Sequence, residues 1–90
     1  MRTVRAIISG RVQGVGYRYW AERTAREEGL SGTVRNRRDG SVELVVSGDD
    51  ARVEAVLAKC RAGPSLAKVT GIDVSDIAWT GSGFTVLPTA

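Results

Sequence analysis

Apolar and polar residues alternate over the first part of the chain, and the spacing then changes. Every second residue from Val4 to Val12 is apolar or glycine, which is the period of a β-strand. From Tyr17 the spacing becomes helical, and Gly29 is expected to end this helix. The residues expected on its buried face are Tyr17, Trp20, Ala21, Thr24 and Ala25, and the charged residues on its other face are Arg18, Glu22, Arg23, Arg26 and Glu27.

The next segments predict a β-hairpin, with strands over Thr33–Arg37 and Ser41–Ser47 joined by Arg38-Asp39-Gly40. A two-residue loop would place Asn36 opposite Glu43. A three-residue loop, with Gly40 in the left-handed conformation, instead pairs Asn36 with Val42. We favour the three-residue loop, because it gathers four apolar residues on one face. These residues are Val34, Val42, Leu44 and Val46.

The second half of the chain predicts one more helix and two more strands. Asp49 or Asp50 is expected to cap the helix, and Gly63-Pro64 is expected to stop it. Its apolar face consists of Val53, Val56, Leu57 and Cys60. A strand follows from about Val69 to Val74. A short terminal strand, Phe84–Leu87, is expected at a sheet edge, because Pro88 cannot donate a hydrogen bond to a ladder.

The element order is therefore βαββαβ with an added terminal strand. In 90 residues it predicts one α+β domain spanning residues 1–90, with two helices packed on one face of an antiparallel sheet. This is the ferredoxin-like arrangement, an α/β sandwich.

Composition narrows the possible chemistry. The chain has 13 basic and 10 acidic residues, no histidine and a single cysteine, so intrachain disulfides, histidine bases and Cys/His metal sites are excluded. The net charge of +3 favours anionic partners only weakly. No apolar run is long enough for a membrane span, and the N-terminus lacks a signal-peptide core. A cytoplasmic location and no membrane partner are expected.

The most informative segment runs from Gly10 to Arg18 and joins the first strand to the first helix. Its three glycines allow consecutive backbone amides to turn toward one point. The helix N-terminus and Arg18 add positive charge, so an oxyanion, phosphate above all, would fit. Dinucleotide-binding and Walker motifs do not match, because Tyr19 occupies the position of a third glycine and no Gly-Lys-Ser/Thr is present. The alternative is a structural turn that binds nothing.

Several side chains have simpler interpretations beside the functional ones. Arg18 could pair with Glu22 on the helix surface, and Asn36 could be an ordinary turn residue. Cys60 and Trp20 are expected in the core, whereas the environment of Trp79 is left open. Glu43 and Asp39 could form a carboxylate pair, but solubility of the hairpin explains both more simply.

Two segments together resemble the signatures of the acylphosphatase family: Gly10-Arg11-Val12-Gln13-Gly14-Val15-Gly16-Tyr17-Arg18, and Gly32-Thr33-Val34-Arg35-Asn36-Arg37-Arg38-Asp39-Gly40-Ser41-Val42-Glu43. Gly48, Gly63-Pro64, Ala67, Val69 and Phe84 extend the likeness over nearly the whole chain. The family usually has a bulky aromatic residue where this chain has Thr33, which affects packing and no catalytic position.

The resemblance implies an enzyme that hydrolyses the carboxyl-phosphate bond of acyl phosphates. By the same matching, Arg18 binds phosphate together with the loop amides of Gln13, Gly14, Val15, Gly16, Tyr17 and Arg18, and Asn36 orients the attacking water. Inorganic phosphate is then both product and inhibitor. No metal or other cofactor is expected, because carboxylate is a good leaving group and phosphoryl transfer depends mainly on positioning and charge neutralisation.

Three other functions remain open from the sequence. The same element order occurs in RNA-recognition domains, although the base-stacking aromatic residues of such domains are missing from the central strands, so no nucleic-acid partner is expected. The chain could be a phosphate binder without catalytic activity. It could also be a carbamoyl-phosphate-processing domain, like the N-terminal part of hydrogenase-maturation proteins, although that domain usually belongs to a much longer chain.

Overall fold

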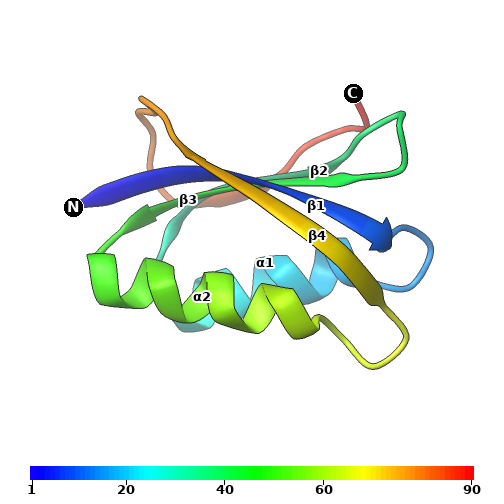
Figure 1. Cartoon of the computed structure of the whole chain (residues 1–90). Coiled ribbons are helices and arrows are strands. Elements are labelled where there is room, and N and C mark those ends of the chain that lie inside the picture. Colours follow the sequence, from blue (N-terminus) through cyan, green and yellow to red (C-terminus); the bar gives the residue numbers. More distant parts are fainter.

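The computed structural model describes residues 1–90 and contains two helices against one face of a five-stranded sheet (Figure 1). The sheet order is β4-β1-β3-β2-β5. The elements are β1 (Arg2–Arg11), α1 (Tyr17–Glu27), β2 (Ser31–Asn36), β3 (Val42–Gly48), α2 (Asp50–Ala62), β4 (Lys68–Asp76) and β5 (Phe84–Val86). The predicted ferredoxin-like α+β fold is confirmed. Neither helix has the length and apolar character needed to cross a bilayer.

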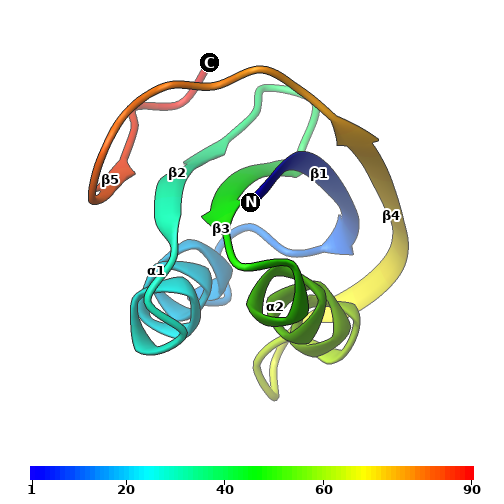
Figure 2. The same cartoon turned by 90° about the vertical axis from the view of Figure 1, so that its left-hand side faces the viewer.

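The sheet is mixed, whereas the sequence predicted an antiparallel one. The first four strands pair antiparallel, but β5 pairs parallel with β2 through Gly32 and Phe84. The connection from β4 to β5 causes this difference. It crosses the open face of the sheet, opposite the helices, to the far edge (Figure 2), so β5 enters in the same direction as β2. The predicted edge position of the terminal strand is correct.

The β2–β3 hairpin has the predicted register. Asn36 pairs with Val42 and Val34 pairs with Leu44. The Arg37 amide donates to the Ser41 carbonyl at 2.8 Å, which closes a loop of three residues. Gly40 has φ of +95°, a conformation that glycine adopts without steric cost. The pairing therefore places the predicted apolar face toward the helices.

The core lies between the sheet and the two helices. Its buried residues follow the alternation seen in the sequence: Val4, Ala6, Ile8 and Val12 from the first strand and its end, Val34, Val42, Leu44 and Val46 from the hairpin, and Ala21, Ala25, Val53, Val56 and Cys60 from the helices. Trp20 is half-buried against this cluster, and its ring centroid lies 5.3 Å from that of Tyr17. Asp49 precedes α2 at the capping position, but its side chain makes no capping hydrogen bond.

Cys60 and Tyr17 join the two helices inside the core. The Tyr17 hydroxyl donates to the Cys60 carbonyl at 2.7 Å, which satisfies a carbonyl in the last turns of α2. Burial raises the pKa of the Tyr17 phenol far above its usual range. Burial also raises the pKa of the Cys60 thiol, from an ordinary value of 9.0 to about 11. Both groups therefore stay neutral to a higher pH in the folded protein than in the unfolded chain.

This environment predicts a loss of stability at alkaline pH. Above pH 9 the Cys60 thiol ionises in the unfolded chain before it does so in the folded protein. The contribution of this thiol to the free energy of unfolding is therefore complete below pH 9 and is lost as pH approaches 11. The free energy of unfolding, measured by urea titration, should therefore fall by about 2 kcal/mol more in the native sequence than in Cys60→Ala between pH 8 and pH 11. An equal fall in both proteins would contradict the buried position of the thiol.

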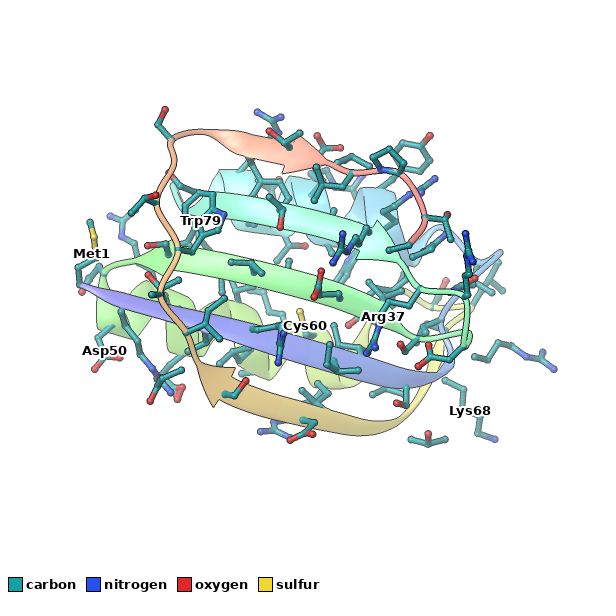
Figure 3. The ribbon with its side chains drawn as sticks, turned by 90° about the horizontal axis from the view of Figure 1, so that it is seen from above. Met1, Arg37, Asp50, Cys60, Lys68 and Trp79 are labelled. Carbon is teal, nitrogen blue, oxygen red and sulfur yellow. The ribbon has the colours of Figure 1, made fainter.

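Two residues on the open face of the sheet need comment: the sequence interpretation of Glu43 was wrong, and the environment of Trp79 was left open. Glu43 is buried, and its carboxylate forms an ion pair with Arg35 at 2.6 Å across the β2–β3 pair. Glu43 therefore does not form a pair with Asp39, and solubility does not explain it. Trp79 is half-buried in the connection that crosses this face (Figure 3).

Candidate active site

The topology of the sheet brings the two sequence motifs together. β1 and β2 both run antiparallel to β3, which lies between them. The C-terminal ends of β1 and β2 therefore lie at the same end of the sheet. The glycine-rich loop follows the end of β1, and Asn36 is the last residue of β2. Figure 1 shows the loop and the β2–β3 hairpin at the same end of the molecule. One pocket is therefore lined by both Arg18 and Asn36, which are 18 positions apart in the sequence.

This pocket has a volume of about 240 Å³. Its lining consists of Val12, Gln13, Gly14, Gly16, Tyr17, Arg18, Tyr19 and Asn36. The structure thus brings together six of the seven residues that the sequence assigned to the site. The side chain of Val15 instead packs, partly buried, against the hydrophobic core, and only its backbone amide remains a candidate for the site. The lining contains no carboxylate, thiol or imidazole, so the polar groups of its residues are amides, one guanidinium and the phenols of Tyr17 and Tyr19.

The backbone amides of the loop are unpaired within the protein. No N–H from residue 13 to residue 19 donates a hydrogen bond to a backbone or side-chain acceptor, and the first helical bond is from Trp20 N to Gly16 O at 3.0 Å. Gly14 and Gly16 have φ of +75° and +80°, the left-handed conformation that side chains disfavour. Consecutive free amides beside a helix N-terminus form a ready anion-binding site.

Arg18 lies in the first turn of α1, beside these amides. Its Nε is buried and has no hydrogen-bond partner, and its guanidinium carbon lies 5.7 Å from the centroid of the Tyr19 ring. The alternative pairing with Glu22 does not occur, because Glu22 forms its ion pair with Arg26 at 3.1 Å. The Arg18 guanidinium is thus free to bind an anion in the pocket.

Asn36 faces the same pocket from the hairpin. It belongs to the strand ladder and pairs with Val42, so it is not part of the turn. Its Oδ1 is buried without a hydrogen-bond partner. A buried acceptor without a partner costs about 1–3 kcal/mol, so such an atom in a native protein calls for an explanation, such as a catalytic role or a bound water.

Two lining residues, Val12 and Tyr19, had no site role assigned from the sequence, and the side chain of Gln13 is a third unexpected contributor to the pocket. Tyr19 is 67% exposed at the pocket mouth, and its position next to Arg18 was the only available signal. The Gln13 side chain was also missed, since only its backbone amide was considered. Its Nε2 donates to the carbonyls of Arg37 and Ser41 at 2.7 and 2.8 Å, and no local pattern in the sequence indicates such a distant contact.

Comparisons with known proteins identify chains of similar sequence and fold. A family model described as acylphosphatase matches residues 4–86. An acylphosphatase from Methylococcus capsulatus is 57% identical over 81 residues, which cover 90% of this chain and 88% of that protein. The crystal structure of acylphosphatase from Bacillus subtilis superimposes with a TM-score of 0.92 at 35% identity, over 97% of this chain and 99% of that one.

A much longer protein contains a similar unit. HypF from T. kodakarensis matches with a TM-score of 0.87 at 29% identity, over 100% of this chain but only 12% of its own. The relatives named acylphosphatase match instead over most of their length. Together with the family model and the high identity over most of the chain, these matches show that this chain belongs to the acylphosphatase family.

Proposed function

We propose that the chain hydrolyses acyl phosphates in this pocket, with the loop amides and Arg18 binding the phosphoryl group and Asn36 orienting the attacking water. One observation carries the assignment. The pocket contains a buried donor, Arg18 Nε, and a buried acceptor, Asn36 Oδ1, and neither has a partner in the protein. A phosphate oxygen satisfies the donor, and the O–H of a water satisfies the acceptor.

Phosphate binding depends on charge and on preformed geometry. The phosphoryl oxygens accept hydrogen bonds from the free amides of residues 13 to 18, while the Arg18 guanidinium neutralises their charge. These donors are already in place, so little reorganisation is needed in the transition state. The acyl group then extends toward solvent at the pocket mouth.

Asn36 Oδ1 accepts a hydrogen bond from the water and directs a lone pair of the water oxygen at phosphorus. A new P–O bond forms, the bond between phosphorus and the acyl oxygen breaks, and its electron pair leaves on the carboxylate. The water proton passes to a phosphate oxygen. Carboxylate leaves without protonation, so the reaction needs no general acid from the lining residues.

This mechanism predicts activity without a metal ion. Hydrolysis of benzoyl phosphate should be unchanged by EDTA, and inorganic phosphate should inhibit competitively, because it occupies the same amides. The measurement is the release of benzoate with and without chelator and at several phosphate concentrations. Loss of activity in EDTA that Mg²⁺ restores would contradict the mechanism, and so would noncompetitive inhibition by phosphate.

A cytoplasmic location and the absence of nucleic-acid partners remain predictions.

A further inference from the structure

The side chain of Gln13 links the two halves of the pocket. Its Nε2 donates one hydrogen bond to the carbonyl of Arg37 at 2.7 Å and another to that of Ser41 at 2.8 Å. Arg37 and Ser41 are the residue pair that closes the hairpin loop, and Arg37 directly follows Asn36. A single side-chain amide thus connects the anion-binding loop to the end of the strand that carries Asn36.

This connection is saturated with hydrogen bonds. The Arg37 carbonyl also accepts the Gly40 amide at 3.1 Å, and the Ser41 carbonyl also accepts the Arg37 amide at 2.8 Å. Each carbonyl therefore accepts two hydrogen bonds, its full capacity. Both N–H groups of the Gln13 side-chain amide donate to these carbonyls, so neither is available to a bound phosphate. As a donor, the side chain can therefore influence the reaction only through the geometry that it holds.

We propose that Gln13 is a positioning residue whose side chain aligns Asn36 with the phosphate-binding loop. The proposal rests on the function proposed above for the loop and for Asn36. The loop determines where phosphorus lies, and Asn36 determines where the water lies, so the attack distance depends on the link between them. A shift of even 1 Å in such an alignment can cost about 10²-fold in rate.

The test is a double-mutant cycle between Gln13 and Asn36. Gln13→Ala removes the link, and Gln13→Met removes it while keeping the length of the side chain. Each should lower kcat for benzoyl phosphate by about tenfold when Asn36 is present, and by less than about twofold in the Asn36→Ala background. The inhibition constant of inorganic phosphate should change by less than about threefold, because the loop amides remain.

Asp39→Ala is the matched control for hairpin stability. The Asp39 carboxylate accepts hydrogen bonds from the Ser41 amide at 2.9 Å and the Ser41 hydroxyl at 2.6 Å in the same loop, but it does not contact Gln13. This variant should lower the thermal midpoint of unfolding and leave kcat unchanged. Thermal midpoints of all variants, followed by circular dichroism, set an assay temperature at which every protein is folded.

The outcomes separate this proposal from the one on which it rests. Equal losses of kcat from Gln13→Ala in both backgrounds would show that Gln13 acts independently of Asn36 and would overturn the proposal alone. A comparable loss of kcat in Asp39→Ala would show that the loss in the Gln13 variants arises from hairpin stability, and it would also overturn the proposal. Full turnover in Asn36→Ala itself would overturn both the role of Asn36 and the positioning role of Gln13.

Discussion

Replacing Arg18 with alanine is expected to lower kcat/KM for an acyl phosphate by about 10²–10³-fold, which corresponds to about 2.7–4 kcal/mol of transition-state stabilisation. Arg18 is the only cationic side chain that lines the pocket, and its buried Nε has no partner in the protein. Its removal leaves the charge of the phosphoryl group to backbone amides alone. The measurement is steady-state hydrolysis of benzoyl phosphate, together with the inhibition constant of phosphate, which should rise.

Two further variants make this test specific. Arg18→Lys should restore little activity, because an ammonium lacks the planar, bidentate geometry of a guanidinium. Arg23→Ala removes the same charge from an exposed position on the same helix, outside the pocket lining, and should leave kcat/KM unchanged. Near-normal turnover in Arg18→Ala, or an equal loss in Arg23→Ala, would exclude a specific role for Arg18.

Replacing Asn36 with alanine is expected to lower kcat by about 10²-fold or more while phosphate still binds. The reason is the division of the site. In the proposed mechanism the loop and Arg18 hold phosphate, whereas Asn36 approaches from the hairpin with a buried acceptor that fits a water. The measurement pairs turnover with the affinity for inorganic phosphate, and the two should respond differently.

Asn36→Asp provides a second comparison, because it keeps the shape of the side chain and introduces a negative charge. That charge repels the phosphoryl group, so both phosphate affinity and turnover should fall. If Asn36→Ala instead retained turnover per folded molecule and only reduced stability, the side chain would serve the hairpin alone. The mechanism would then have no residue that orients the water.

The two sets of variants should affect different kinetic constants. Changes at Arg18 should weaken phosphate binding and slow the chemical step together, because in the proposed mechanism the guanidinium interacts with the phosphoryl group in both the ground state and the transition state. Changes at Asn36 should slow the chemical step alone. A site that only bound phosphate would respond to Arg18 and not to Asn36, so this comparison also tests a binding function without catalysis.

Local patterns in the sequence determined the elements and the register of the hairpin. The two-residue and helical periods identified the buried face of each strand and helix, because a side chain on the wrong face would expose apolar surface to water. The same register placed Asn36 opposite Val42, as observed. The glycines of the loop indicated free amides, since those positions need left-handed backbone conformations.

Only the tertiary structure decided which of these features are neighbours. Periodicity assigns a residue to a face but says nothing about the strand beside it. The parallel pairing of β5 depends on where the β4–β5 connection crosses the sheet, and the burial of Glu43 depends on Arg35 across the hairpin. Likewise, Asn36 lies beside the loop because β1 and β2 run in the same direction on either side of β3 and end together. Gln13 contacts the hairpin carbonyls because the chain returns there 24 to 28 residues later. Contacts over such separations arise from the packing of the whole chain, which no local pattern encodes.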